Sequence, residues 1–196
     1  MLFSIIFVSK FSTTMKKSFL ILSAAIISLS LAAFTFLPNQ PLTPKPEGDG
    51  IKWMSWEQAV ALNKTTPKKF VIDVYTDWCG WCKVMDRETF TKPEIIKYVN
   101  DNYYAVKLNA EQKEDIIFGD QKFSYVSQGR SGYHTFAASL LDNNMGYPTL
   151  VYLTEKFERV VISPGFKKPE QLMKELKFTG ENAFSKMTWD QYMAEK

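Results

Sequence analysis

The 196-residue sequence is poor in the residues that bind metals through sulfur or nitrogen: Cys79 and Cys82 are its only cysteines, and His134 is its only histidine. A structural zinc site needs about four ligands of this kind, so these three residues argue against one. A structural disulfide across two intervening residues would close a very small loop and gain little chain entropy. We therefore favour a dithiol that cycles between its reduced and oxidised states, and expect no metal site.

The sequence also lacks an excess of charge outside its N-terminal part. Residues 1–37 contain three of the 24 lysines and arginines and no acidic residue, so the other 21 basic residues balance 21 acidic ones. Nucleic acids and anionic membrane surfaces bind proteins through basic patches. The composition therefore predicts neither of them as a partner.

The N-terminal residues combine positive charge with a long apolar run. Met15, Lys16 and Lys17 precede the apolar segment 19–37, which is typical of a secretory signal. The segment is long for a signal peptide and close to the roughly 20 residues that span a membrane. Small residues at 30–33 could form a cleavage site. We expect residues 1–37 to be either a cleaved signal peptide or an N-terminal membrane anchor, with the rest of the chain exported.

Proline and glycine concentrate in residues 38–50, which contain four prolines and two glycines. This composition favours a stiff, exposed linker. The following residues, 51–196, have the length of one folded domain, and 45% of all residues are hydrophobic, which is enough for a packed core. The predicted organisation is an export or anchor segment at 1–37, a linker at 38–50 and one domain at 51–196.

The most informative stretch is FVIDVYTDWCGWCK at residues 70–83. Residues 70–75 are rich in β-branched and aromatic side chains and predict a buried strand, in which the carboxylate of Asp73 is an exception. Cys79 and Cys82 then open a helical pattern that runs to about Glu88. The first amides of a helix have no partner within it, and the helix dipole adds partial positive charge, so both favour a thiolate on Cys79. This arrangement indicates redox chemistry.

Periodicity, capping residues and turn residues predict the other elements. We expect helices at 55–64, 91–102, 133–141 and 169–178 and a short one after 188, and strands at 51–54, 104–108, 150–153 and 160–162. The last two strands should form an antiparallel pair. Residues 110–130 depart from this alternation, and the apolar segments on either side of Gly119 and Asp120 predict an inserted β-hairpin.

The sequence resembles the thioredoxin superfamily over about residues 70–178. Its WCGWCK motif at 78–83 is similar to the active-site signature of that family, and Tyr147-Pro148-Thr149 is similar to the segment that holds the family's cis-proline opposite the CxxC. Asp73 resembles the buried aspartate of the family, and Lys107 resembles the lysine near it.

Two further motifs are DWC at 77–79 and ETFxxPE at 88–94. They resemble motifs of exported thioredoxin-like domains, one of which is the C-terminal domain of the thiol:disulfide interchange protein. The resemblance implies the α/β thioredoxin fold, a central mixed sheet flanked by helices. Here we expect a β-hairpin insert before the cis-proline and an extra C-terminal helix. The chain differs from thioredoxin itself at Trp81, where proline is usual, and in the 110–130 insert.

The resemblance and the order of the thiols suggest a role for each catalytic residue. Cys79 should be the exposed nucleophile that attacks a substrate disulfide, and Cys82 should be the shielded thiol that resolves the mixed disulfide. Asp73, with a pKa raised by burial, could accept the proton of Cys82. The alternative for Asp73 is a structural carboxylate paired with Lys107.

Other residues could tune the thiols or bind substrate. Asp86 lies four residues after Cys82, so it could face the thiols or remain a solvated surface acid. Trp78 and Trp81 could form an apolar lip around Cys79, or pack in the core.

The backbone of Tyr147 could pair with an extended substrate if Pro148 is cis, whereas an ordinary turn proline is the alternative. The proline ring would also keep metals away from the cysteines. For His134, a capping or packing role near a helix start is more consistent with its position than a catalytic one.

These observations predict an exported thiol–disulfide oxidoreductase without a bound cofactor, located in the periplasm or anchored to face it. Its partners should be protein disulfides or dithiols and an upstream protein that donates or accepts electrons. Reduction of protein disulfides is favoured, because the relatives with the most similar motifs are reductants. A disulfide oxidase or isomerase is one alternative, and a redox-regulated binding module is another.

Overall fold

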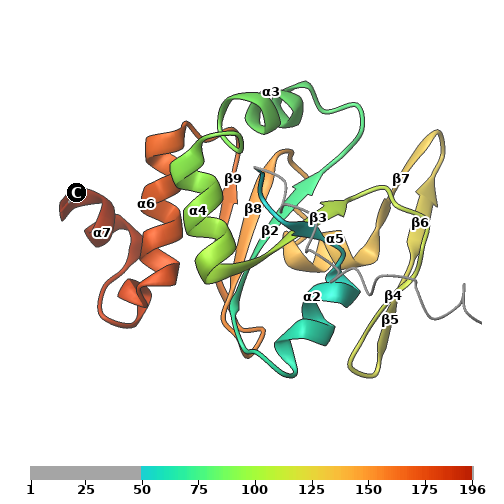
Figure 1. The fold of residues 1–196 in the computed structure, drawn as a ribbon. Coiled ribbons are helices and arrows are strands. Elements are labelled where there is room, and N and C mark those ends of the chain that lie inside the picture. The colour runs from blue at the N-terminus through green and yellow to red at the C-terminus, as the bar shows by residue number, and fades with distance from the viewer. Residues whose placement is uncertain (1–49, 196) are drawn as a thin grey trace, which may run out of the picture. The chain divides into compact units, whose positions relative to one another are not determined.

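A five-stranded mixed sheet organises residues 50–195, the part of the chain that our computed structural model describes (Figure 1). The strands lie in the order β1–β3–β2–β8–β9. Their bounds are β1 Trp53–Met54, β2 Lys69–Tyr75, β3 Tyr103–Asn109, β8 Thr149–Leu153 and β9 Arg159–Pro164. Strands β1, β3 and β2 are parallel, and β8 is antiparallel to both β2 and β9. The expected mixed sheet, including the antiparallel pair after Pro148, is confirmed.

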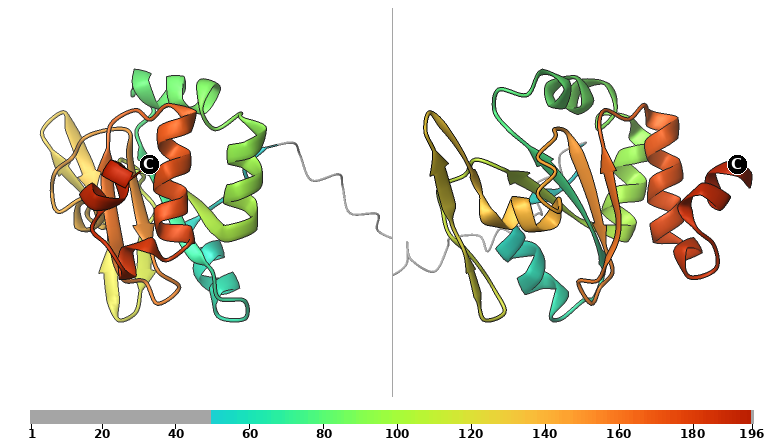
Figure 2. Two further views of the ribbon diagram at one scale, coloured as in Figure 1. Left: turned by 90° about the vertical axis from the view of Figure 1, so that its left-hand side faces the viewer. Right: turned by 180° about the vertical axis from the view of Figure 1, so that it is seen from behind.

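Helices cover both faces of this sheet (Figure 2). One face packs against α2 (Trp56–Asn63) and α5 (Thr135–Leu140), and the other packs against α3 (Gly80–Glu88), α4 (Pro93–Asn102) and α6 (Pro169–Gly180). A short 3-10 helix (Ala183–Ser185) and α7 (Trp189–Glu195) follow α6, so the extra C-terminal helix is confirmed. The structure therefore has the thioredoxin fold with additions.

Alternation along β2 decides what each residue of the central strand contacts. Phe70, Ile72 and Val74 face the α2 and α5 side, and Val71 faces the α3, α4 and α6 side. Side chains of a strand point alternately to its two faces, so Asp73 points to the same side as Val71, toward α3. The sequence pattern of β2 thus delivers a carboxylate to the face that carries the cysteine helix.

Reciprocal helix caps are present at both ends of the domain. Ser55 and Gln58 form a reciprocal capping box at the start of α2. Thr188 and Gln191 exchange the same two hydrogen bonds at the start of α7. These contacts satisfy amides that otherwise have no partner in the first turn of a helix.

The insert contains two hairpins, not the single one that we predicted. Strands β4 (Ile116–Phe118) and β5 (Gln121–Phe123) form the first, and β6 (Tyr125–Gln128) and β7 (Ser131–His134) form the second. Gly119 and Gly129 both adopt positive φ in the two turns, a conformation that glycine adopts readily. The prediction of a helix from residue 133 is wrong at its start, because residues 133 and 134 belong to β7.

Two other predictions concern residues that the structure does not describe. The signal or anchor at 1–37 and nearly all of the linker at 38–50 lie outside residues 50–195. Within residues 50–195, none of the helices has the length and apolar character needed to cross a bilayer.

Candidate active site

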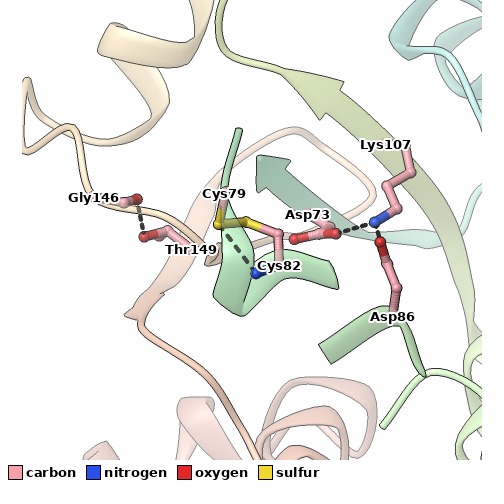
Figure 3. Close-up of a disulfide and its surroundings, with 7 residues drawn as sticks. All are labelled: Asp73, Cys79, Cys82, Asp86, Lys107, Gly146 and Thr149. Atoms are coloured by element: carbon pink, nitrogen blue, oxygen red, sulfur yellow. Dashed lines mark hydrogen bonds and ion pairs between the residues drawn. A yellow bond between two sulfur atoms is a disulfide. The ribbon is translucent and has the colours of Figure 1, made fainter. Parts of the chain in front are cut away.

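Cys79 and Cys82 form a disulfide at the start of α3 (Figure 3). Cys79 is the N-cap residue of this helix, and the backbone N–H of Cys82 donates a hydrogen bond to Cys79 Sγ over 3.0 Å. Strand β2, the central strand of the sheet, ends four residues earlier, so it places the disulfide just beyond its C-terminal end. A thiolate on Cys79 would accept this same amide at the positive end of the helix dipole.

Exposure does not separate the two cysteines as we expected. Cys79 is 4% exposed and Cys82 is 3% exposed, so the prediction of an exposed Cys79 is wrong for this oxidised state. Their positions on the helix do differ. Cys79 precedes the first turn and its sulfur accepts an amide, whereas Cys82 lies within the first turn.

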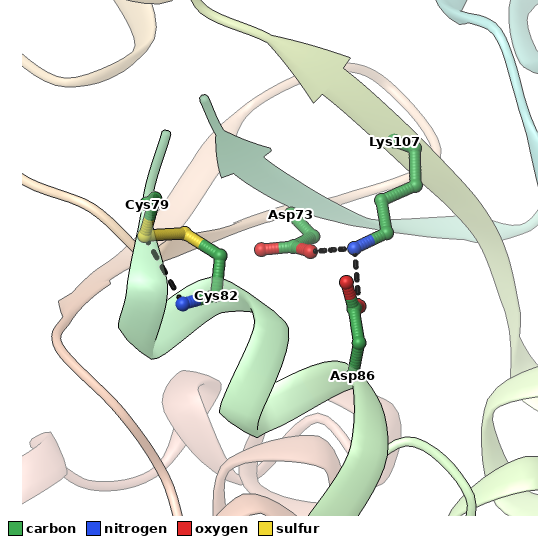
Figure 4. A network of polar contacts seen from close by, with 5 residues as sticks. All are labelled: Asp73, Cys79, Cys82, Asp86 and Lys107. Carbon is green, nitrogen blue, oxygen red and sulfur yellow. Dashed lines mark hydrogen bonds and ion pairs between the residues drawn. A yellow bond between two sulfur atoms is a disulfide. The ribbon is translucent and has the colours of Figure 1, made fainter. Parts of the chain in front are cut away.

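A buried carboxylate lies beside the disulfide. Asp73 is 1% exposed, and its Oδ2 accepts a hydrogen bond from Lys107 Nζ over 2.6 Å. The other oxygen, Oδ1, has no hydrogen-bond partner within residues 50–195. Figure 4 shows this oxygen pointing toward Cys82. The geometry leaves Asp73 Oδ1 available to a proton from that side.

Charge and burial act in opposite directions on Asp73 and Lys107. Burial raises the pKa of Asp73, and the opposing effect of Lys107 does not cancel this rise. Burial also lowers the pKa of Lys107, but Asp73 and Asp86 outweigh it and raise that pKa. The pair therefore combines a lysine that stays cationic with a carboxyl group that holds a proton more readily than a solvated aspartate does.

Asp86 belongs to the same network. Its Oδ1 accepts a hydrogen bond from Lys107 Nζ over 2.5 Å, and its side chain is 46% exposed (Figure 4). Neither of our two expectations describes it fully, since Asp86 is not an isolated surface acid and contacts the lysine instead of the thiols. Its charge also acts on Asp73 and contributes to the raised pKa of that carboxyl group.

The proline loop lies at the same end of the sheet as the disulfide. Val74 of β2 pairs with Thr149 of β8, so the residues just before Thr149 lie next to the segment that leads to Cys79 (Figure 3). The Tyr147–Pro148 peptide bond is cis, as the family resemblance implied. Thr149 Oγ1 donates a hydrogen bond to the carbonyl oxygen of Gly146 over 2.8 Å, which closes the loop.

Two exposed tryptophans flank the disulfide. Trp78 is 66% exposed and Trp81 is 63% exposed, so the core-packing alternative is wrong for both. The Trp78 ring meets the Tyr147 ring edge-on at a centroid distance of 5.8 Å. The Trp81 ring lies 5.7 Å from that of Phe166. Both rings are therefore surface groups next to the cysteines in the sequence, and their role as an apolar lip around Cys79 stays a prediction.

One charged residue beside this lip was missed. Glu111 Oε1 accepts a hydrogen bond from the indole N–H of Trp78 over 3.1 Å. Burial, together with the Glu111 carboxylate, raises the pKa of Tyr147 to about 12. Glu111 lies in a polar segment after β3, and no motif in the sequence connects that segment with the CxxC.

His134 has the structural role that we expected. Its Nδ1 accepts the backbone N–H of Phe136, which caps α5, and its Nε2 lies 3.1 Å from the carbonyl oxygen of Glu114. The ring is fully buried. Within residues 50–195, there is no cluster of three or more His, Cys, Asp or Glu side chains that could hold a metal ion.

Comparison with protein families places the chain in a known group. Residues 40–190 match the model of the Thioredox_DsbH family, which is described as a protein of unknown function, DUF255. An uncharacterized Caenorhabditis elegans protein, B0495.5, is 31% identical over 84 residues, which are 42% of this chain. The match spans only 12% of the length of that relative.

Solved structures agree with the fold. A thioredoxin-fold protein from Helicobacter pylori is 14% identical, with a TM-score of 0.53 over 75% of this chain and 86% of that one. The oxidised C-terminal domain of Neisseria meningitidis DsbD is 20% identical, with a TM-score of 0.43 over 63% of this chain and 90% of that one. The family match and the Helicobacter pylori structure confirm the expected likeness to the thioredoxin superfamily.

Proposed function

Because this chain belongs to the Thioredox_DsbH family of thioredoxin-fold proteins, we propose that it is an exported thiol–disulfide oxidoreductase that reduces protein disulfides with Cys79 and Cys82. Two features of the arrangement around the disulfide together support the proposal. The sulfur of Cys79 accepts the Cys82 amide at a helix start, and the unpaired oxygen of buried Asp73 points toward Cys82. A structural disulfide would need neither feature.

The first step is attack by the Cys79 thiolate on a substrate disulfide. A new S–S bond forms between Cys79 and one substrate sulfur, and the other substrate sulfur leaves as a thiolate. The Cys82 amide and the helix dipole stabilise the attacking thiolate. Cys79 is the better nucleophile of the two because it occupies the N-cap position.

The second step resolves the mixed disulfide. Cys82 loses its proton to Asp73, either directly or through a water molecule, and its thiolate attacks Cys79 Sγ. The second substrate sulfur leaves, and the Cys79–Cys82 disulfide forms, which is the state of this structure. A raised pKa suits Asp73 to this task, while Lys107, which also pairs with Asp86, holds its carboxylate in place.

The exposed aromatic residues and the proline loop would bind the substrate. Trp78 and Trp81 offer apolar surface on either side of the disulfide. The backbone at Tyr147, next to cis-Pro148, would pair with an extended substrate segment. An upstream dithiol protein must then reduce the disulfide of this chain, since the cycle consumes two electrons.

Export follows from the sequence of the N-terminal part. A positive segment followed by the apolar run 19–37 supports either a cleaved signal or an anchor that leaves the domain in the periplasm. An alkaline phosphatase fused to the C-terminus, which is active only after export, should be active in bacterial cells. Deleting residues 1–37 should abolish that activity.

The function is tested by reduction of insulin with the full chain. With dithiothreitol as the electron donor, the chain should accelerate precipitation of the insulin B chain, and Cys79→Ser should remove the acceleration. A chain that binds a partner protein in a redox-dependent manner but turns over no disulfide would be a binding module. A chain that instead oxidises reduced substrates faster than it reduces disulfides would be an oxidase or isomerase.

A further inference from the structure

The second hairpin of the insert, β6–β7, forms one wall of a cavity beside the disulfide. The cavity has a volume of about 440 Å³, and the residues that matter here are Trp78, Glu111, Gln128, Ser131, Tyr133 and Tyr147. Figure 1 shows this hairpin beside the loop that joins β2 to α3. We name the cavity the hairpin pocket.

The opposite wall of the hairpin pocket belongs to the redox site. Trp78 directly precedes Cys79, and Tyr147 directly precedes Pro148, and the two rings contact each other edge-on. A polypeptide held between the disulfide and the proline loop would therefore pass along the pocket. Because side chains of an extended peptide alternate between two sides, a residue flanking its reactive cysteine could enter the pocket.

The charge of the pocket is negative and uncompensated. Glu111 is the only charged residue among those that line it. One carboxylate oxygen of Glu111 accepts the Trp78 indole N–H, and the carboxylate has no ion-pair partner within residues 50–195. Gln128 adds a polar side chain that could accept or donate a hydrogen bond.

Two cations lie nearby without neutralising Glu111. Lys113 and Arg130 line a neighbouring cavity of about 470 Å³ that Glu111 also borders. The Lys113 ammonium lies over the ring of Tyr125, and Arg130 occupies the turn of the hairpin. Neither forms an ion pair with Glu111 within the described part of the chain, so the Glu111 carboxylate remains available to a ligand.

We propose that the hairpin pocket is a specificity site that takes a lysine or arginine side chain flanking the reactive cysteine of the protein substrate, with Glu111 as its partner. The proposal rests on the proposed function and adds the substrate class to it. A half-buried carboxylate that already orients Trp78 offers a basic side chain a charge-assisted hydrogen bond. The tryptophan and tyrosine rings offer apolar surface to the stem of that side chain.

The test uses two peptides that differ only in charge. Each contains one cysteine joined by a disulfide to thionitrobenzoate, and the cysteine is flanked by lysines in one peptide and by glutamates in the other. The reduced full chain attacks this disulfide and becomes oxidised, and it releases the peptide thiol and coloured thionitrobenzoate. The lysine peptide should react about tenfold faster than the glutamate peptide, and the ratio should shrink at high salt.

Two variants assign the preference to Glu111. Glu111→Gln keeps the shape and an acceptor for Trp78, and it should bring the ratio close to one. Glu111→Lys should reverse the preference. Glu114→Gln removes an exposed charge from the same segment but outside both cavities, so it should keep the parental ratio.

The outcomes separate this proposal from the function on which it rests. Equal rates with the two peptides, or a parental ratio in Glu111→Gln, would contradict the specificity site while the chain remained a reductase. Loss of the preference in Arg130→Gln would also contradict it, since the preference would then depend on the hairpin turn. Failure to release thionitrobenzoate from either peptide would contradict the proposed reductase function itself.

Discussion

Asp73 and Cys82 come from different elements, one from the central strand and one from the following helix, and strand alternation brings them to the same face. The unpaired oxygen of Asp73 points toward Cys82, and Lys107 holds the other oxygen. Burial raises the pKa of this carboxyl group. At the scale of single residues, the proposed reaction would therefore depend on two thiols in a fixed order and on one proton acceptor.

The order of the thiols can be tested by trapping. Cys79→Ser should reduce insulin turnover to background, because the remaining thiol lies inside the first helical turn. Cys82→Ser should instead accumulate a stable mixed disulfide with substrate, visible on a non-reducing gel and by mass spectrometry. If the Cys79 variant trapped substrate and the Cys82 variant did not, the roles of the two cysteines would be reversed.

The role of Asp73 can be tested by kinetics near neutral pH. Asp73→Asn keeps the shape of the side chain but cannot take a proton, so it should slow resolution of the mixed disulfide by about 10²-fold. The first attack should change much less. Stopped-flow measurement separates the two steps, and Asp120→Asn, an exposed residue in a hairpin turn, serves as the control. Unchanged rates for both steps would leave Asp73 with a structural role only.

The same substitution should change how stability depends on pH. The pKa of Asp73 is higher in the folded protein than in the unfolded chain, so the folded state keeps its proton to higher pH. Below the pKa that Asp73 has in the unfolded chain, the carboxyl group is protonated in both states. The stability of the parent relative to Asp73→Asn is then at its highest. As pH rises through the folded pKa, the parent should lose stability relative to Asp73→Asn, by at most about 1.4 kcal/mol per pH unit.

Urea unfolding of the oxidised proteins between pH 4 and pH 9 measures this difference. A difference that stays constant over the whole range would show that Asp73 does not titrate as its burial implies.

At the scale of elements, the first hairpin packs against the core and the second lines the hairpin pocket. Phe118 of β4 and Phe123 of β5 pack against Trp56 of α2 and Phe136 of α5. Hairpin β6–β7 has mostly exposed residues and lines the hairpin pocket. One insertion in the sequence therefore contributes to core packing in its first half and to a surface cavity in its second.

The first half could be recognised from the sequence, but the second could not. Apolar residues around Gly119-Asp120 mark β4–β5 as a hairpin. Residues 127–132 are polar or glycine and show no alternation, so pairing there depends on the turn at Gly129 and on contacts with distant residues. The predicted helix at 133–141 begins two residues too early for a related reason. The residues from 133 onward fit a helical pattern, but His134 ends strand β7 and is the N-cap of α5.

The packing role of the insert predicts a difference between two tryptophans. Trp56 is buried and contacts rings from α5, β2 and β4, so Trp56→Ala should lower the free energy of unfolding by about 3–5 kcal/mol. Trp81 is mostly exposed, and Trp81→Ala should change the free energy of unfolding by no more than about 0.5 kcal/mol. Equal losses for the two variants in urea unfolding would show that the Trp56 cluster does not hold the insert.

At the scale of the whole molecule, the sequence predicts the residues around the disulfide better than it predicts the hairpin pocket. The CxxC, Asp73 and the cis-proline lie in a local motif or at strand ends, so periodicity and family resemblance locate them. The hairpin pocket joins residues 78, 111, 128–133 and 143–147. These are close only because β2, β3 and the insert fold together, and the short polar segments that carry them have no distinctive pattern.

The equilibrium redox potential of the Cys79–Cys82 pair tests the central claim most directly. The full chain is equilibrated with glutathione buffers, and the reduced fraction is measured by thiol alkylation and mass spectrometry. Thioredoxin has a potential of about −270 mV, and a strong oxidant of the same fold has one of about −120 mV. A reductase of protein disulfides should have a potential closer to the first value than to the second. A potential near the second value would contradict the account, because the disulfide would then oxidise its substrates.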